Sequence, residues 1–355
     1  MKILFANPFG IGDALFTTPV ISNIKRQLPN AKIGYLCNRR VAPLLEQDPR
    51  IYKFFVYEKD EFRGLWEQSR CRCLKEIRHL FSDIKSEKFD YVLDFSLAGE
   101  FAFAFWLMGI KKRAGFNYRN RAKFLNKKIP LTGFNDKHVI EYYLELLKFL
   151  GVKPADKNIK IFISENEKRK TDNFLKSKGI YQSDKTVTVV PGGGASWGKD
   201  SYRKHYPADR FATVCDKLIR EQGAKIIIAG DLKEKKLVGK VASYMKEKPS
   251  LVTVALPLKE FIAVLSQCKL LFCNDGGPLH IAVGLGIRTV SVFGPVDEKV
   301  YGPYPPDKKH RVIASDIECR PCYKNFKVPG CKNRRCLEKL QTEEVFDACK
   351  EQLYG

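Results

Sequence analysis

An aspartate that follows the first predicted strand is well placed to do chemistry in this 355-residue chain. Lys2–Asn7 reads as a strand, and the turn Phe9-Gly10-Ile11-Gly12-Asp13 precedes a helix predicted over Asp13–Leu28. Glycines between strand and helix are typical of a dinucleotide-binding turn. A carboxylate at a helix start would repel a pyrophosphate, however, and no third glycine follows at the required spacing. Two interpretations stay open: Asp13 caps its helix, or it presents an ionised carboxylate as a general base.

A run of glycines after a β-branched strand is a candidate anion site. Thr186–Val190 reads as the strand, and a helix is predicted to start at Pro207. Glycines let backbone amides approach an anion closely, and Lys204, just before that helix, is placed to neutralise a diphosphate. A plain strand-to-helix turn with an exposed lysine is the alternative. The residues of this candidate loop are Gly192, Gly193, Gly194 and Ser196.

A second turn of this kind follows the strand predicted over Leu270–Cys273. It runs through Asn274-Asp275-Gly276-Gly277 to Pro278, and proline fits the first position of a helix. Amides at a helix start attract anions, and His280 lies within the first helical turn. A lone histidine or a lone Asp-Gly-Gly is usually structural. Together at the end of a strand, they predict a ligand site.

The elements that must position these groups alternate between strand and helix. Such alternation predicts an α/β fold with two doubly wound parallel sheets, whose ligands bind at the carboxyl ends of the strands. In the first half, the predicted strands are Lys2–Asn7, Lys32–Leu36, Phe54–Tyr57 and Tyr91–Phe95, with a long helix over Gly64–Lys85. In the second half, the strands are Thr186–Val190, Lys225–Ala229, Leu251–Val254, Leu270–Cys273 and Thr289–Phe293, with a helix from Pro207 to about Gln222.

The length favours two domains, because a chain of this size exceeds what one hydrophobic core usually supports. A polar stretch rich in Lys, Glu, Asn and Ser is the expected linker, although its Glu165–Lys178 part could be helical. The chain ends in a predicted helix over Glu343–Leu353, with Val345, Phe346, Cys349 and Leu353 facing inward. The expected divisions are a first domain 1–165, a linker 166–184, a second domain 185–315 and a cysteine-containing tail 316–355.

The net charge of +23 favours anionic partners: nucleic acid, an anionic membrane or a phosphorylated substrate. A solvated surface with scattered lysines is the alternative. Basic residues concentrate in residues 63–88, 111–128 and 324–335. The first apolar run ends at Pro8, too early for a signal peptide, and Phe101–Ile110 is too short to span a bilayer. We therefore expect a cytoplasmic protein.

Cytosolic thiols are kept reduced, so the eleven cysteines do not predict a disulfide framework. Four of them cluster near the C-terminus: Cys319, Cys322, Cys331 and Cys336. They could ligate one zinc ion tetrahedrally, although the spacing is short for a zinc ribbon. Structural thiols or an adventitious disulfide remain alternatives. No metal is assigned to the catalytic site.

Taken together, these motifs resemble glycosyltransferase family 9, the heptosyltransferases of lipopolysaccharide core assembly. The similarity covers nearly the whole chain in the right order. The segments that carry it are Ile11-Gly12-Asp13 with Thr17-Thr18-Pro19, Asp94-Phe95, Arg113–Phe116, Pro191–Ser196 with Lys204–Pro207, Asn274–His280 and Val292–Pro295.

The resemblance implies a GT-B fold with two Rossmann-like domains and a central cleft. It implies inverting, metal-independent transfer of a heptose from a nucleotide-heptose such as ADP-heptose, without a cofactor, to a hydroxyl of a lipid A–Kdo or core acceptor. Asp13 would be the base, with Gly12 and Thr17 on the acceptor side. Phosphate binding falls to Lys204, Gly276, Gly277 and His280. Asp275 would hold the sugar or nucleotide, and Glu234 the ribose. Position 276 is Gly where many members have Thr or Ser, so a backbone amide must replace a hydroxyl contact.

An acceptor of this type sits in an anionic membrane, where surface lysines would dock the enzyme at the cytoplasmic face of the inner membrane. Phe101–Trp106 could contribute, with a buried helix as the alternative. The competing functions are the same chemistry with another nucleotide sugar and glycan acceptor, a nonhydrolysing sugar-nucleotide epimerase, and a basic nucleic-acid-binding protein. No recognisable nucleic-acid module supports the last of these.

Overall fold

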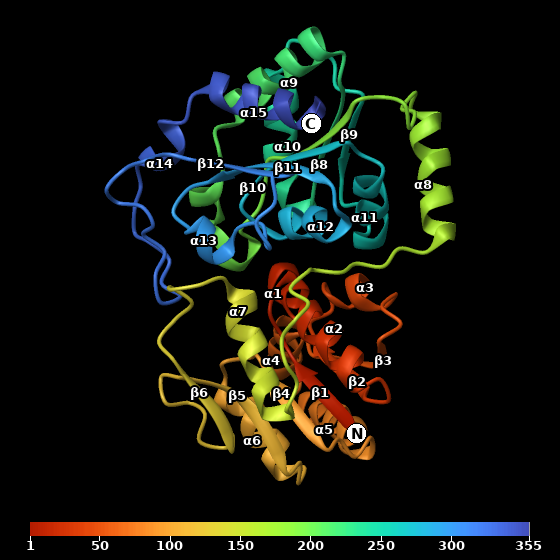
Figure 1. The fold of residues 1–355 in the computed structure, drawn as a ribbon, viewed down its shortest axis with the longest axis vertical. Coiled ribbons are helices and arrows are strands. Elements are labelled where there is room, and N and C mark those ends of the chain that lie inside the picture. Colours follow the sequence, from red (N-terminus) through yellow and green to blue (C-terminus); the bar gives the residue numbers. More distant parts are fainter. Residues whose placement is uncertain (355) are drawn as a thin grey trace. The chain divides into compact units, whose positions relative to one another are not determined.

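The computed structural model describes residues 1–354, and its contacts divide the chain into two compact units, Met1–Phe162 and Ile163–Gly355. Within the described residues each unit is built on a six-stranded sheet, and all the strand pairs are parallel. Helices cover both sheets (Figure 1). The predicted α/β class with two parallel sheets is therefore confirmed.

The sheet of the first unit has the strand order β3-β2-β1-β4-β5-β6. Its central strand β1 is buried on both faces, as a parallel sheet between two layers of helices requires. The sequence did not predict β5, which begins with charged residues, or the edge strand β6, which contains Pro130. The strands are β1 (Lys2–Ala6), β2 (Lys32–Cys37), β3 (Ile51–Val56), β4 (Tyr91–Asp94), β5 (Lys112–Tyr118) and β6 (Lys127–Leu131).

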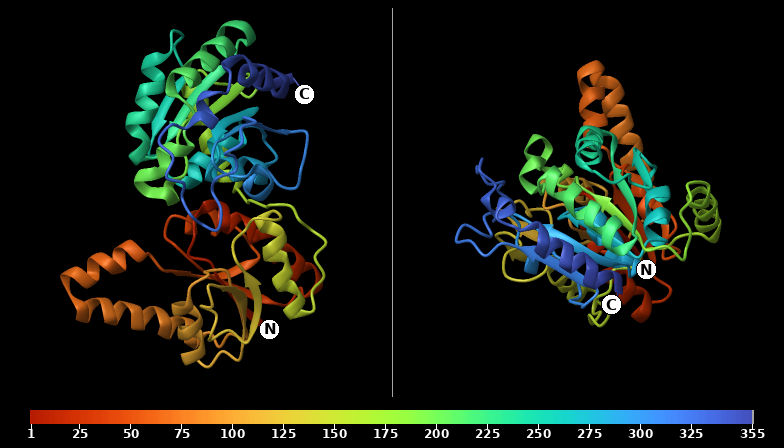
Figure 2. Two further views of the ribbon diagram at one scale, coloured as in Figure 1. Left: turned by 90° about the vertical axis from the view of Figure 1, so that its left-hand side faces the viewer. Right: turned by 90° about the horizontal axis from the view of Figure 1, so that it is seen from above.

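Two predicted helices of the first unit are each divided in the structure. The helix expected over Asp13–Leu28 breaks at Thr17, and the one expected over Gly64–Lys85 breaks at Ser69, whose hydroxyl accepts from Arg72 N and starts a new helix. The second pair, α4 and α5, forms a hairpin that projects from the unit (Figure 2). The helices are α1 (Ile11–Phe16), α2 (Thr18–Gln27), α3 (Ala42–Leu45), α4 (Lys59–Gln68), α5 (Arg70–Ser86), α6 (Gly99–Leu107) and α7 (Val139–Leu144), followed by a 3-10 helix (Glu145–Leu150).

The sheet of the second unit has the order β12-β11-β10-β7-β8-β9. Its strands are β7 (Thr186–Val190), β8 (Lys225–Gly230), β9 (Leu251–Val254), β10 (Leu270–Asn274), β11 (Arg288–Phe293) and β12 (His310–Ala314). Its helices are α8 (Glu165–Ser177), α9 (Ala208–Gln222), α10 (Lys235–Tyr244), α11 (Leu258–Ser266), α12 (Gly277–Leu285), α13 (Glu298–Tyr301), α14 (Arg335–Glu338) and α15 (Thr342–Tyr354), with 3-10 segments Ala195–Lys204 and Leu232–Glu234. Of the strands, only β12 was not predicted.

Most of the stretch expected to link the halves is helix α8. Ser164 caps it, with its hydroxyl accepting from Glu167 N at 3.2 Å. Leu175 and Ile180 pack in a small core with Val264 and Cys268, so α8 is held against α11 (Figure 1). The contact boundary at residues 162–163 accordingly places this helix in the second unit.

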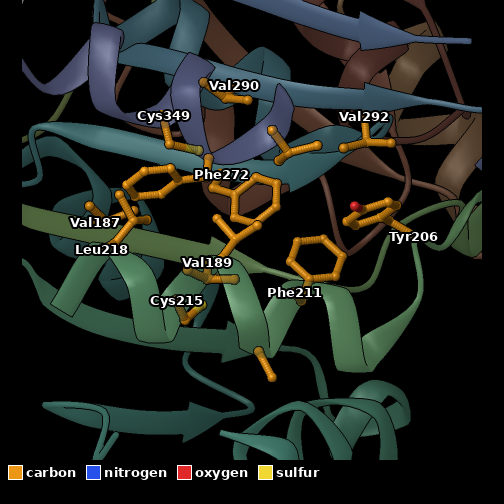
Figure 3. Close-up of a cluster of buried hydrophobic side chains, with 14 of the residues drawn as sticks. Val187, Val189, Tyr206, Phe211, Cys215, Leu218, Phe272, Val290, Val292 and Cys349 are labelled. Carbon is orange, nitrogen blue, oxygen red and sulfur yellow. The ribbon is translucent and has the colours of Figure 1, made fainter. Parts of the chain in front are cut away.

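The main core of the second unit lies between its sheet and helices α9 and α15 (Figure 3). Phe211 of α9 and Phe272 of β10 have ring centroids 4.5 Å apart. Cys349 of α15 is fully buried, and the expected inward face of that helix is confirmed. Each large apolar side chain buried in this way stabilises the fold by roughly 1.5–3 kcal/mol.

Candidate active site

The turn that carries Asp13 is fixed by asparagines at the ends of two neighbouring strands. Asn7, just after β1, donates to Asp13 O at 3.0 Å and accepts from Phe9 N at 3.2 Å. Asn38, just after β2, donates to Phe9 O at 2.5 Å and to Pro8 O at 3.2 Å. Because both asparagines are buried, these bonds are shielded from water, and they hold the backbone around Asp13 in one conformation.

Asp13 is not the N-cap residue of its helix, because the cap position of α1 belongs to Gly10. Asp13 lies in the first helical turn, where its carboxylate is partly exposed and the helix N-terminus favours its charged form. The role of general base stays a prediction for Asp13.

The other two acceptor-side candidates have different surroundings. Gly12 lies next to Asp13 in α1 and is partly exposed. Thr17 is fully buried, and its hydroxyl donates to Ala14 O at 2.7 Å and bonds the Tyr35 hydroxyl at 2.9 Å. Its side chain therefore stabilises the junction of α1 and α2 instead of facing a ligand.

A second carboxyl group lies at the same edge of this sheet. Strand pairing places Ala6, the last residue of β1, beside Asp94, the last residue of β4. Asp94 is buried and accepts from Ser96 N at 2.9 Å. Burial raises its pKa from 3.8 to about 6. The sequence pointed to Asp94 only as a family landmark, although an acid at the end of a parallel strand is itself a signal.

In the second unit, the glycine-rich loop after β7 meets a carboxylate. Gly193 N donates to Glu234 Oε1 at 2.7 Å, and Asp231 N donates to Glu234 Oε2 at 3.0 Å. A Cβ on Gly192 would lie 1.9 Å from Glu234 Oε1, so a larger residue would displace the Glu234 carboxylate. Burial raises the pKa of Glu234, while the two backbone N–H bonds lower it. One of the amides expected to bind phosphate is thus already occupied by Glu234.

A buried ion pair lies beside this loop. Lys204 Nζ donates to Asp275 Oδ2 at 2.6 Å, and both side chains are buried. The Lys204 ammonium also lies 4.6 Å from the centroid of the Trp197 ring. Gly194 has a φ of +72°, and a Cβ there would come within 2.9 Å of Lys204 Cδ. The glycine therefore leaves room for the lysine to reach Asp275.

The loops after β7 and β10 touch each other. A Cβ on Gly276 would lie 3.3 Å from Gly193 Cα, so the two backbones are in contact. Asn274 joins them, since its side-chain amide donates to Pro191 O at 2.6 Å and accepts from Tyr206 N at 2.9 Å. Asn274 was not among the predicted site residues, although its position at the end of β10 marks it as one.

The remaining candidates extend this site. Gly277 opens α12, which Gly276 precedes as the cap residue. His280 is buried in α12, and burial, followed by the charge of Lys204, lowers its pKa to about 3. Its imidazole is therefore neutral near pH 7 and can donate without carrying charge. Ser196 lies in the 3-10 segment after the glycines and is exposed.

The four C-terminal cysteines are free thiols, of which Cys336 is buried and Cys319 exposed. Burial, and then the charges of the other three, raises the pKa of Cys336 to about 11. Within residues 1–354, no group of three or more His, Cys, Asp or Glu side chains is arranged to hold a metal ion. Zinc binding by these cysteines stays a prediction.

Comparison with known proteins identifies relatives along the whole chain. The sequence model of glycosyltransferase family 9 (heptosyltransferase) matches residues 77–332. The lipooligosaccharide heptosyltransferase 2 of Campylobacter jejuni is 26% identical over 355 residues, covering 99% of this chain and 98% of its own. Among solved structures, a family 9 glycosyltransferase from Veillonella parvula superimposes with a TM-score of 0.81 at 23% identity, over 99% of this chain and 97% of that one. The E. coli ADP-heptose lipopolysaccharide heptosyltransferase II gives 0.76 at 19%, over 100% and 99%.

Proposed function

This chain belongs to glycosyltransferase family 9, and from that premise we propose that it transfers a heptose from ADP-heptose to a hydroxyl of a lipid A–Kdo or lipopolysaccharide-core acceptor. The buried Lys204–Asp275 pair between two touching glycine loops carries this proposal. A cation held there, beside the amides at the start of α12 and a neutral imidazole, suits the negative charge of a nucleotide diphosphate. The similar E. coli protein is an ADP-heptose transferase, which supports the choice of donor.

On the donor side, the diphosphate shares the Lys204 ammonium that Asp275 binds in the structure. The amides at the start of α12, at Gly276 and Gly277, and the neutral His280 ring add hydrogen bonds to the phosphates. Glu234, already oriented by two backbone N–H groups, keeps lone pairs for a ribose hydroxyl. These groups stabilise the charge that develops on the departing nucleotide.

On the acceptor side, Asp13 removes the proton of the acceptor hydroxyl as its oxygen attacks the anomeric carbon. The attack comes from the face opposite the leaving nucleotide, so the anomeric configuration inverts. General-base assistance of this kind is worth roughly 10²–10⁴-fold. Lys204 and the α12 amides carry the leaving-group charge, and the proposed mechanism uses no metal.

The acceptor is a phosphorylated glycolipid, and we place the protein at the cytoplasmic face of the inner membrane. Within residues 1–354, no helix combines the length and apolar character needed to cross a bilayer. The charge of +23 supports contact with anionic lipid at a surface instead.

A donor screen tests the proposal. The purified chain is given ADP-heptose, other ADP-sugars and UDP-sugars, each with a lipid A–Kdo acceptor, and both nucleotide release and glycolipid product are measured. We expect turnover with ADP-heptose. Turnover with a different nucleotide sugar alone would overturn the donor assignment. Transfer from ADP-heptose only to a glycan that lacks the lipid A–Kdo core would overturn the acceptor assignment.

A further inference from the structure

Helix α6 is apolar on two faces, of which only one is buried. Phe101 and Phe105, one turn apart, pack in the core of the first unit. Phe103, Trp106 and Leu107 point outward and are 41%, 48% and 61% exposed. The two interpretations of this segment from the sequence, a buried helix and a membrane contact, thus describe opposite faces of one helix. An exposed apolar face of this kind marks an interaction site.

The exposed face is part of a built aromatic platform. Phe124, from the connection between β5 and β6, lies 4.8 Å from Phe103 and 5.4 Å from Trp106 between ring centroids. The connection is anchored under it, because Ala122 and Leu125 pack against Ala102 of α6. The connection that carries Phe124 is therefore packed against α6.

Positive charge surrounds this platform. From Phe101 to Asn135 the sequence contains no Asp or Glu. Arg113 links the basic segments, since its guanidinium donates to Phe124 O at 2.6 Å and its backbone N to Asn126 Oδ1 at 2.9 Å. In the part of the chain that the structure describes, none of the exposed bases forms an ion pair with a carboxylate. These exposed bases are Lys111, Lys112, Arg119, Arg121, Lys123, Lys127 and Lys128.

A pocket of about 670 Å³ continues the same surface around the end of α6. Met108 and Phe89 contribute apolar walls. Lys88, Lys111 and Lys112 line it as well, together with Asp90, whose carboxylate accepts from Lys2 N at 2.7 Å. A cavity with apolar walls and several ammonium groups suits the phosphate and the adjoining hydrocarbon of a phospholipid.

We propose that this surface, the outer face of α6 with segments 111–113 and 119–128, docks the protein on an anionic lipid bilayer. Phe103, Trp106 and Leu107 enter the interfacial layer, where aromatic side chains are favoured. The bases lie against the lipid phosphates. This docking surface rests on the proposed function, because a membrane glycolipid acceptor requires the enzyme to reach the bilayer.

A protein partner fits this surface less well. The cores of protein interfaces are depleted of lysine, whereas interfacial membrane surfaces combine Trp and Phe with Lys and Arg. The α4–α5 hairpin provides the contrast within the same unit. It also exposes Trp66 and Leu74, but residues 59–86 contain five acidic residues among the bases. That surface is not matched to an anionic bilayer.

The test measures sedimentation of the full chain with vesicles of phosphatidylcholine, alone or mixed with equal phosphatidylglycerol. We expect binding to the anionic vesicles only, reversed by salt because exposed charges are screened. The charge variant Lys111→Gln/Lys123→Gln/Lys127→Gln should bind about 100-fold more weakly, at roughly five-fold per charge. The platform variant Phe103→Ser/Trp106→Ser/Leu107→Ser should bind the anionic vesicles at least about ten-fold more weakly.

Matched controls change equally exposed residues elsewhere. Arg169→Gln/Lys170→Gln/Lys178→Gln removes three exposed charges from the α8 region, and Trp66→Ser/Leu74→Ser removes exposed apolar groups from the hairpin. Both controls should bind the anionic vesicles within about two-fold of the wild type. Brominated lipid should quench the fluorescence of the wild type, and Trp106→Phe should remove that quenching.

Binding of the platform and charge variants at wild-type strength would overturn the docking surface. So would a platform variant that merely converts an oligomer to a monomer with vesicle binding intact, because the face would then join protein copies. A deacylated, water-soluble acceptor separates the two proposals. The docking variants should transfer sugar to it at the wild-type rate. If neither the wild type nor the docking variants transfer sugar, the proposed function is wrong. The binding of the wild type to anionic vesicles would still support the docking surface.

Discussion

Both units place polar groups at the carboxyl ends of their parallel strands, but the groups differ in kind. In the first unit, the edge presents carboxyl groups, Asp13 from α1 and Asp94 from β4, beside a turn fixed by asparagine side chains. In the second, the edge is made of glycine backbone that surrounds the Lys204–Asp275 pair. We propose that the first edge exchanges a proton and that the second holds a diphosphate.

Because of this difference, we expect substitutions in the two units to change different quantities, kcat in the first and donor affinity in the second. Changes at the first edge should alter the rate of transfer and leave donor affinity alone. Changes at the second should alter donor affinity first. Substitutions at the two edges test whether that separation holds.

Replacing Asp13 with alanine should have the largest effect on turnover. The base is lost, so kcat should fall by roughly 10²–10⁴-fold, while calorimetry should show ADP-heptose affinity within about two-fold of the wild type. Asp13→Asn keeps the size of the side chain and should lose as much activity. A collapse of donor affinity in either variant would mean that Asp13 belongs to the donor site, and the comparison would fail.

Lys204→Met should weaken both donor binding and the fold. Donor affinity should fall by about 100-fold, because hydrogen bonds between charged groups in a shielded site are strong. Asp275 is left as a buried carboxylate without its cation, which destabilises a protein by roughly 3–5 kcal/mol. Denaturant unfolding and calorimetry measure the two effects separately.

The double variant Lys204→Met/Asp275→Asn separates them further. Without a buried charge, it should recover most of the free energy of unfolding while donor affinity stays low. If donor affinity returned together with stability, Lys204 would serve the fold and not the diphosphate.

Much of the second unit could be predicted from its sequence, because its strands and its glycine-rich turns are each marked by residues that are neighbours along the chain. β7 and β9 match the predicted residues, and the predicted loop Gly192–Gly194 lies in contact with Gly276. What local reasoning missed is Asn274 as the residue that joins the loops. Its contact with Pro191 spans 83 positions, a distance that spacing along the chain does not show.

The first unit was harder to predict for a related reason. The asparagines that fix the Asp13 turn come from separate strands, and Asn38 is about thirty positions from its partners. The sequence could not decide between cap and base for Asp13, since that choice depends on where the helix starts. β5 and β6 were missed because their charged and proline-containing sequences resemble loops. They become strands through pairing, β5 with β4 and β6 with β5.

Gly192→Ala should give a smaller effect, confined to the second edge. The added Cβ would displace the Glu234 carboxylate from Gly193 N and Asp231 N. We expect a loss of roughly 1–3 kcal/mol in unfolding free energy and about ten-fold in donor affinity, with kcat at saturating donor nearly unchanged.

Gly239→Ala is the matched control, because nothing lies within 4 Å of a Cβ added there. Gly239 is exposed in α10, so the alanine should stabilise the chain by up to about 1 kcal/mol and leave donor affinity unchanged. If Gly192→Ala, like this control, lowered neither stability nor donor affinity, the bond from Gly193 N to Glu234 would not hold the loop in place.

Asp94→Asn should change stability alone, and the size of this change depends on pH. Burial raises the pKa of Asp94 from 3.8 to about 6, so the folded chain holds this proton more tightly than the unfolded chain does. The favourable contribution is complete below pH 3.8 and disappears as the pH rises through 6. At pH 7, the buried charge therefore costs about 2–3 kcal/mol, which asparagine avoids.

Denaturant unfolding at several values between pH 4 and pH 7 measures this effect. The variant should match the wild type near pH 4 and exceed it increasingly toward pH 7. Equal stability at all pH values would show that a cationic group compensates the carboxylate in the fold. If the stabilised variant also transfers heptose more slowly at pH 7, the first edge retains a destabilising charge because the reaction uses it. The proton chemistry of that edge would then involve Asp94 as well as Asp13.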